Sequence, residues 1–348
     1  MPATAAAIHV DAPAQAIARP SCPVCERPAR AVFMSRAEIA AELDARDRFF
    51  ARRLDRRFSR DELRDVTDAA LGTPAAILRC MRCGVLIRDA AGGENVFRED
   101  HYRKDVLKRL HDTHVRAFGE KESDYRPLLP PRAHVVEVGS YVGGFLTAAT
   151  GWGWSAIGTD IGRDPVGFCR GLGLDVRRLH LHECGLDADS VDAVFVWNCF
   201  EQIPDPRQLL AEAQRVLRVA GLLVIRVPDA GFYMRCERRL NRSDDSALDM
   251  LAYNGLLGWP HRFGYEAVSL RRVVENHGFV LAGTLRRAAV RPLRDAMHAW
   301  AQAEEAALIG SGSQGWIELT FRKDEGVTEI ARCVRPSRRK EQSCTEIA

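Results

Sequence analysis

Short apolar runs alternate with helical patterns between residues 134 and 229. Runs such as HVVEVG, SAIGTD and VDAVFVWN indicate buried strands, whereas the spacing of GGFLTAATGWG and DPRQLLAEAQRVLRVAG indicates helices, the second one ending at Gly221. LDVRRLHL, between them, indicates one further strand. Strands that alternate with helices in this way form a parallel sheet with helices on both faces. We therefore expect an α/β fold with a Rossmann-like, mostly parallel sheet.

The sharpest turn of this region lies in the segment VVEVGSYVGGF, residues 135–145. Gly139 follows an apolar strand directly, and without a Cβ it lets the chain turn and lets a ligand contact the backbone. Gly143 and Gly144 open the next helix, whose free N–H groups face the crevice at the carboxyl ends of the strands. Asp160 ends the next strand, about 20 residues later, where a carboxylate binds ribose hydroxyls. The pattern predicts a cofactor that contains a nucleoside.

The glycine spacing separates two kinds of cofactor. Dinucleotide enzymes use G-x-G-x-x-G, whereas Tyr141 occupies the place of the second glycine here. Glu137 lies at the strand end, where it would repel a pyrophosphate, so a cationic sulfonium ligand with an ammonium group fits better. Two alternatives stay open: a dinucleotide cofactor, and glycines that merely end a strand and begin a helix.

Three segments resemble motifs of the class I S-adenosylmethionine-dependent methyltransferases. They are EVGSYVGGF, VDAVFVWNCFEQIPDP at residues 191–206 and GLLVIRVPD at residues 221–229. The resemblance covers about residues 130–286, with a last strand at 314–323. It implies a seven-stranded, mostly parallel sheet with helices on both faces and S-adenosylmethionine as the cofactor.

The resemblance also implies which residues hold this cofactor. Glu137 and Gly139 would line its methionine part, Asp160 would bind the ribose, and Ile161 would pack on the adenine. The full set of cofactor-binding residues expected in this way is Glu137, Gly139, Ser140, Tyr141, Gly143, Asp160, Ile161, Trp197 and Asn198. One departure matters: Gln202 stands where the family's E-H-x-P-D-P segment has a histidine, so a role that needs this histidine is in doubt.

Two C-x-x-C pairs, Cys22–Cys25 and Cys80–Cys83, precede the methyltransferase-like region. The chain has 10 cysteines and no recognisable export signal, so we expect a reducing, cytoplasmic compartment, where such pairs bind metal more often than they form disulfides. Four thiolates match a tetrahedral, structural Zn²⁺ site with ligands Cys22, Cys25, Cys80 and Cys83. The gap between the pairs exceeds common zinc-ribbon spacing, which leaves unbound thiols or a redox pair as alternatives.

Composition and pattern divide the chain into successive parts. Hydrophobic residues make up 46% of the chain, enough for a large core, and a net charge of +3 is too small to argue for a nucleic-acid partner. No apolar run approaches the ~20 residues of a membrane span. We expect a disordered tail at 1–20, a zinc-ribbon-like module with a helical insert at 21–90, a helical bridge at 91–131, a methyltransferase domain at 132–323 with a lid at 230–268, and a disordered tail at 324–348.

Candidate catalytic residues lie in the lid and in the loop before it. Methyl transfer depends on positioning, and an oxygen nucleophile also needs a base. His261 is the candidate base, with Tyr253 and Tyr265 as substrate contacts, and Glu201 is an alternative base. The opposing interpretation is a packed lid without catalytic groups.

The sequence thus predicts a methyltransferase that uses S-adenosylmethionine and acts on a small-molecule acceptor, such as a sugar or a cell-envelope glycan precursor. This choice of acceptor rests on family analogy alone. The alternatives are an RNA or protein methyltransferase, whose cysteine module grips the polymer, and a non-catalytic module that binds S-adenosylmethionine.

Overall fold

The computed structural model describes Cys22 and residues 24–27, 30–41, 75–89, 104–231, 234, 261–284 and 316–324. The expected tails at 1–20 and beyond residue 324, the helical insert after residue 41 and most of the lid, including Tyr253, lie outside the described residues. Residues 36–41, where the expected insert begins, are helical.

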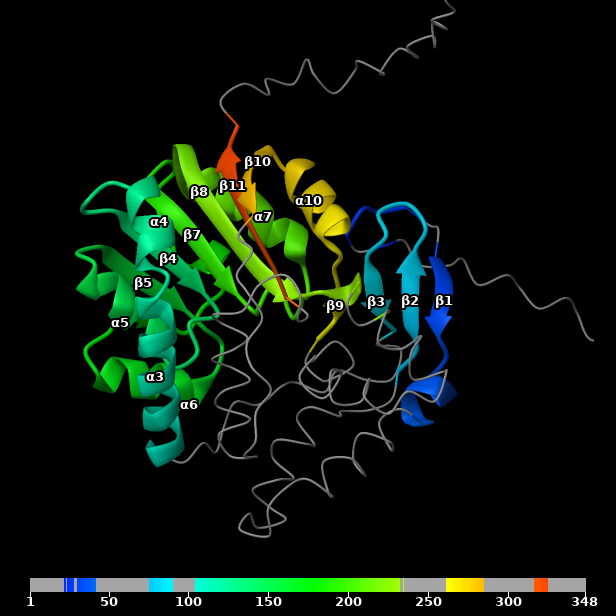
Figure 1. The fold of residues 1–348 in the computed structure, drawn as a ribbon, viewed down its shortest axis with the longest axis horizontal. Coiled ribbons are helices and arrows are strands. Elements are labelled where there is room, and N and C mark those ends of the chain that lie inside the picture. The colour runs from blue at the N-terminus through cyan, green and yellow to red at the C-terminus, as the bar shows by residue number, and fades with distance from the viewer. Residues whose placement is uncertain are drawn as a thin grey trace, which may run out of the picture.

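A seven-stranded sheet forms the centre of the described residues (Figure 1). Its order is β10-β11-β8-β7-β4-β5-β6. The strands are β4 (His134–Val138), β5 (Ser155–Thr159), β6 (Val176–Arg177), β7 (Val191–Trp197), β8 (Leu217–Pro228), β10 (Phe279–Thr284) and β11 (Trp316–Lys323). Strands β4 to β8 are parallel, and only β11 runs antiparallel to its neighbours β8 and β10. The expected α/β fold with a mostly parallel seven-stranded sheet is confirmed.

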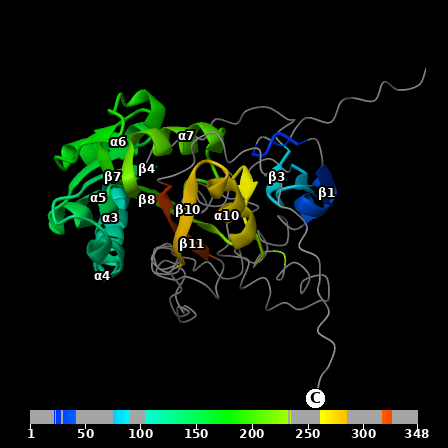
Figure 2. The same ribbon diagram turned by 90° about the horizontal axis from the view of Figure 1, so that it is seen from above.

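Helices cover both faces of this sheet (Figure 2). They are α3 (Lys104–Gly119), α4 (Glu122–Tyr125), α5 (Gly144–Gly151), α6 (Arg163–Gly171), α7 (Pro206–Val216) and α10 (Ala267–Glu275). Two short 3₁₀ helices, η1 (Arg126–Leu128) and η2 (Leu181–Glu183), connect them to the strands. Side chains of α3, α5 and α6 pack in one buried cluster, and those of α7 and α10 pack in another on the opposite face.

Strand β7 shows why the apolar runs are unbroken. All seven of its residues are buried. Val194 and Val196 join the cluster under α7 and α10, whereas Phe195 and Trp197 join the cluster under α5. A strand that is covered on both faces has no solvent side, so its sequence lacks the polar alternation of a surface strand.

Two sequence expectations about element boundaries are wrong. The helix expected to reach Gly221 ends at Val216, because Leu217 adopts an extended backbone and pairs with Val191 at the start of β7. The expected strand LDVRRLHL is only two residues long. It is cut short because the backbone N–H of His180 donates to Glu183 Oε2 at 2.8 Å, which begins helix η2 instead.

A second, four-stranded sheet contains the cysteine pairs. Its order is β1-β2-β3-β9, and each neighbouring pair is antiparallel. The strands are β1 (Arg30–Met34), β2 (Ile77–Cys80), β3 (Leu86–Arg88) and β9 (Phe263–Gly264). Strand β9 lies within the range expected for the lid, residues 230–268, so this sheet joins the N-terminal module directly to the methyltransferase-like region (Figure 1).

A buried ionic group ties α4 to the sheet. Lys121, directly before α4, donates to both carboxylate oxygens of Glu318 on β11, at 2.8 and 2.6 Å. Tyr125 Oη donates to Glu318 Oε1 at 2.5 Å, and Arg226 Nη1 on β8 lies 4.0 Å from Oε2. Burial lowers the pKa of Lys121 to about 8, against the attraction of Glu318. Glu318 is therefore the anion that balances two buried cations.

We expect Glu318→Gln to destabilise the fold by about 3–5 kcal/mol, because it leaves Lys121 and Arg226 buried without this counter-charge. The matched control is Glu275→Gln, which breaks the exposed Arg271–Glu275 pair of α10, an interaction worth less than about 1 kcal/mol. Urea unfolding gives both values. Equal losses in the two variants would contradict a structural role for the buried group.

Candidate cofactor and acceptor site

The glycine turn at the carboxyl end of β4 has the backbone that its sequence requires. Gly139 (φ +72°), Tyr141 (φ 45°) and Gly143 (φ +70°) lie in the left-handed region, and α5 begins immediately afterwards. A Cβ on Gly139 would stand 2.5 Å from the Sγ of Cys199, and one on Gly143 would stand 2.5 Å from Leu174. Only glycine fits either position, because neighbouring side chains of the protein fill the space that a Cβ would take.

Asp160 fastens this turn to the end of β5. Its Oδ2 accepts the backbone N–H of Tyr141 at 2.7 Å, and its Oδ1 accepts that of Gly162 at 2.8 Å. Burial raises the pKa of Asp160, and these N–H bonds oppose the rise. Each carboxylate oxygen keeps a further lone pair for a ligand, because an ionised carboxylate has about four acceptor sites.

Several buried polar atoms around the turn have no hydrogen-bond partner among the described residues. They are Oε2 of Glu137, Oγ of Ser140 and Oδ1 of Asn198. Burial, together with the negative charge of Asp160, raises the pKa of Glu137 well above its usual range. A buried polar atom without a partner is unfavourable by a few kcal/mol. The donors of an ammonium group and of a ribose would satisfy such atoms, so these residues fit the expected cofactor.

The remaining expected cofactor residues lie on opposite sides of the turn. Ile161 follows Asp160 and is 54% exposed, so its side chain offers an apolar surface next to the ribose-binding position. Trp197 instead points into the aromatic core, with its ring centroid 5.7 Å from that of Phe145 and 4.9 Å from Lys121 Nζ. The structure thus gathers Glu137, Ser140, Asp160 and Asn198 around the turn and places the Trp197 ring behind it.

Glu201 and His261, expected as alternative bases, lie next to each other. His261 Nε2 is 3.4 Å from Glu201 Oε1. Glu201 is only 1% exposed, and burial raises its pKa to about 7. The loop that carries Glu201 also reaches the cofactor turn, because Cys199 packs against Gly139. A carboxylate–imidazole pair therefore stands beside the site, at the carboxyl end of β7.

Gln202 occupies the place of the family's histidine and has a local role. Its Nε2 donates to the backbone oxygen of Asn198 at 2.9 Å and lies 3.4 Å from Glu201 Oε1. It therefore closes the loop after β7 on itself. Tyr265, expected as an acceptor contact, is fully buried against Phe200, with ring centroids 5.3 Å apart, so it packs in the core.

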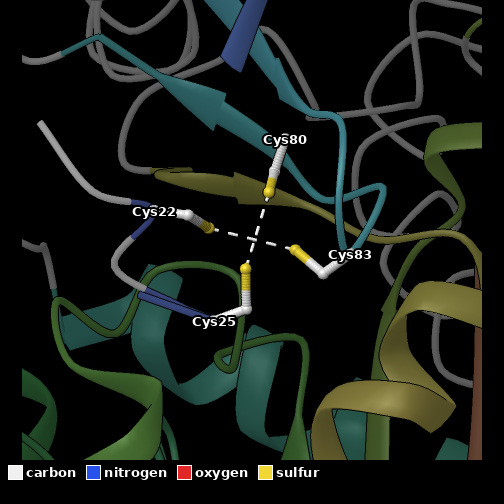
Figure 3. Close-up of side chains that lie close together, drawn as sticks. All are labelled: Cys22, Cys25, Cys80 and Cys83. Atoms are coloured by element: carbon white, nitrogen blue, oxygen red, sulfur yellow. Dashed lines mark hydrogen bonds between the residues drawn. The ribbon is translucent and has the colours of Figure 1, made fainter. Parts of the chain in front are cut away.

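The four cysteines of the N-terminal pairs converge (Figure 3). Their sulfur atoms all lie within 4.8 Å of one another, with Cys22 and Cys83 3.9 Å apart and Cys25 and Cys80 3.6 Å apart. Four thiolates around a tetrahedral Zn²⁺, at roughly 2.3 Å from the metal, have sulfurs roughly 3.8 Å apart. A hydrogen bond from Cys83 lowers the pKa of Cys22 to about 5, as expected for thiols close enough to share a ligand. The arrangement fits a structural metal ion.

Sequence reasoning missed the partners that hold these residues. The Lys121–Glu318 ion pair and the pairing of β9 with β3 join segments that are far apart in the chain. No local sequence pattern indicates either contact. The contact of Cys199 with Gly139 was equally invisible, although it places the loop after β7 against the cofactor turn.

A parallel sheet with a glycine turn after its first strand, and a carboxylate after its second, is the arrangement expected for a class I S-adenosylmethionine-dependent methyltransferase. A family model described as a methyltransferase domain matches residues 101–282, which is more than half of the chain. The chain belongs to this methyltransferase family. No curated protein matches it.

Several solved methyltransferase structures are similar to part of this chain at low sequence identity. The methyltransferase bound to the Trm112 activator of Haloferax volcanii is 15% identical, with a TM-score of 0.46, and the match covers 65% of this chain and 95% of that one. A SAM-dependent methyltransferase of Thermotoga maritima is 15% identical, with a TM-score of 0.44 and coverage of 63% and 94%. One from Archaeoglobus fulgidus is 17% identical, with a TM-score of 0.40 and coverage of 60% and 94%. Family membership rests on the family model and not on these likenesses.

Among the described residues, no helix has the length and apolar character that crossing a membrane requires.

We expect Asp160→Ala to weaken binding of S-adenosylhomocysteine about 10- to 100-fold while the protein stays folded, because hydrogen bonds to a charged group are worth about 1.5–3 kcal/mol. The control is Asp164→Ala, which removes a nearby carboxylate that pairs with Arg163 at the surface. Titration calorimetry and thermal melting measure the two effects. Unchanged affinity in Asp160→Ala would remove the ribose-binding role.

Proposed function

We propose that this protein transfers the methyl group of S-adenosylmethionine to a hydroxyl group of a small-molecule acceptor, such as a sugar or a cell-envelope glycan precursor. The observation that carries this proposal is the Glu201–His261 pair beside the glycine turn. A hydroxyl is a poor nucleophile until its proton is removed, and a positioned base contributes about 10²–10⁴-fold to such a reaction. An acceptor that is already nucleophilic would not need the pair.

The residues around the turn would hold the cofactor. Glu137 would accept hydrogen bonds from the ammonium group, and Asp160 would accept hydrogen bonds from the ribose hydroxyls with its remaining lone pairs. Ile161 would pack on the adenine. When bound, S-adenosylmethionine supplies an activated methyl group for in-line displacement. The protein's own contribution is then to align the acceptor oxygen and to take up its proton.

Glu201 orients the imidazole that takes this proton. Glu201 Oε1 lies 3.4 Å from Nε2 of His261, so the carboxylate contacts one edge of the imidazole that takes up the acceptor's proton. The carboxylate stabilises the imidazolium that results, as the carboxylate does in other carboxylate–histidine pairs.

The recessed position of the pair favours a small acceptor over a polymer. Glu201 is 1% exposed and the His261 side chain 13% exposed, so only a compact group can reach them. The modest net charge also gives no electrostatic footprint for RNA.

We further propose that Cys22, Cys25, Cys80 and Cys83 bind one structural Zn²⁺. The convergence of their sulfur atoms supports this assignment. Three of the four are nearly fully buried, which suits a closed site without an open coordination position for substrate.

We expect His261→Gln to reduce methyl transfer about 10²–10⁴-fold, with S-adenosylhomocysteine affinity nearly unchanged, because only proton removal is lost. His134→Gln is the control, since this exposed histidine begins β4 at the opposite edge of the sheet. In the wild-type protein, kcat/KM rises with pH through about 7, where Glu201 loses its proton and can stabilise the imidazolium. A flat pH profile together with full activity of His261→Gln would exclude the pair as the base.

The acceptor class is tested by radiolabelled methyl transfer into fractionated cell extract. Label should enter a small-molecule fraction and survive pretreatment of the extract with nuclease or protease. Loss of labelling after nuclease would indicate RNA, and loss after protease would indicate a protein acceptor. Cofactor binding without labelling of any fraction would indicate a non-catalytic module.

Purified protein should contain about one zinc ion per chain, and Cys22→Ser should lose it, because a structural site needs all four ligands. Cys184→Ser is the control, since this cysteine lies in helix η2's C-terminal turn, away from the cluster. Elemental analysis measures the metal content. A wild-type protein purified without metal, and unable to take up zinc, would contradict the assignment.

A further inference from the structure

Strand β9 is held by the cysteine module on one side and by Glu201 on the other. Phe263 and Gly264 pair with β3, and the backbone N–H of Arg88 donates to the oxygen of Arg262 at 2.9 Å. In the other direction, the N–H groups of Arg262 and Phe263 both donate to the backbone oxygen of Glu201, at 2.8 and 3.0 Å. A single short segment therefore connects the module to Glu201 of the proposed Glu201–His261 pair. His261 is the first residue of this segment.

The side chains behind the pair belong to the same buried cluster as the cysteines. Cys22, Cys80 and Cys83 pack in one cluster with Phe200 and Phe263. Phe200 immediately precedes Glu201, and Phe263 follows His261 by two positions. The residues next to Glu201 and His261 therefore belong to the same buried core as the cysteines, and Figure 3 shows β9 as the dark yellow arrow that passes the four cysteines.

The second cysteine pair also contacts the helix that follows β9. Arg272 on α10 donates to the backbone oxygen of Arg82, between Cys80 and Cys83, at 3.0 Å. Arg79, directly before Cys80, pairs with Glu266 at 3.3 Å, and Glu266 caps α10. The turn between Cys80 and Cys83 is thus bonded to α10, and the residue before it is paired with the residue that caps α10.

The cofactor turn, in contrast, is held by contacts that do not involve the module. The N–H groups of Gly139 and Ser140 donate to the oxygen of Thr159, at 2.8 and 3.0 Å, and that of Tyr141 donates to Asp160. All of these groups belong to β4, β5 and the turn between them. The Glu201–His261 pair and the glycine turn after β4 are therefore held by separate sets of contacts.

We propose that metal binding by the four cysteines positions Glu201 and His261 through β9, so that metal loss releases this pair and leaves the cofactor turn intact. The module's own strands have five, four and three residues, too few to form a stable sheet without further support. In such small modules, metal-binding free energy is folding free energy. The catalytic meaning of the released pair rests on the proposed function; the structural coupling does not.

The experiment is amide hydrogen exchange on the full chain, zinc-loaded and after chelation. On metal removal, we expect exchange of the Arg262 and Phe263 amides to accelerate at least about 10-fold, because their acceptor Glu201 is no longer held against β9. The amides of Gly139 and Ser140 should change less than about threefold, and affinity for S-adenosylhomocysteine should stay within the same limit. Unchanged protection at Arg262 and Phe263 would overturn the inference, and so would an equal loss at Gly139 and Ser140.

Variants separate metal binding from an effect of the chelator. Cys83→Ser should reproduce the accelerated exchange, and Cys184→Ser, outside the cluster, should not. Cys83→His keeps a zinc ligand and should restore both the metal and the protection of Arg262 and Phe263. A Cys83→His protein that binds zinc but exchanges as fast as Cys83→Ser would contradict positioning by the metal.

The outcome also distinguishes this inference from the proposed function. A protein that loosens at 261–265 on metal loss but transfers no methyl group would refute the function and leave the coupling in place. A protein that transfers methyl groups, but whose Arg262 and Phe263 amides stay protected from exchange after chelation, would refute the coupling and leave the proposed function in place.

Discussion

The hydrogen bonds from Asp160 to the cofactor turn are the constraint on which the rest of the site depends. They join the ends of β4 and β5, and they place the N–H of Tyr141 and that of Gly162 on one buried carboxylate. The positive φ angles of the turn are sustained by this connection and by the contact of Cys199 with Gly139. The glycine turn is consequently held mainly by β5 and Asp160, and the loop after β7 adds the contact of Cys199 at the carboxyl edge of the sheet.

The cysteine module is part of the same core. Its buried side chains, from Cys22 to Ile87, continue the cluster that lies under α7 and α10. The described part of the module is supported from two sides, by four convergent thiols and by its contacts with β9 and α10. A metal site and a partner surface are the usual ways in which small domains gain stability.

The sequence predicted features that depend on local patterns. It did not predict features that depend on contacts between distant parts of the chain. Strands β4 and β7 were evident because burial on both faces leaves largely apolar runs, whereas β5, whose first residue is exposed, was indicated by the short run SAIGTD that Asp160 ends. The end of α7 was not, since QRVLRVAG keeps helical spacing and only the pairing of Leu217 with Val191 ends the helix. Strand β9 has two residues, too few for any periodicity. Glu201, in the loop after β7, meets His261, in the expected lid, and no sequence spacing encodes this contact.

Two buried carboxylates show how differently this protein treats charge in its core and at its crevice. Glu318 receives two bonds from Lys121 and one from Tyr125, so its burial is balanced within the protein. Glu137 is buried to the same degree, yet its Oε2 finds no partner among the described residues, and the neighbouring Asp160 adds a second negative charge. Such a carboxyl group either becomes protonated, with a raised pKa, or pairs with a cation, because an unpaired buried charge is strongly unfavourable. The protein therefore pairs Glu318 within its core, whereas among the described residues it leaves Oε2 of Glu137 without a partner at the glycine turn, where we propose that the cofactor's ammonium group binds.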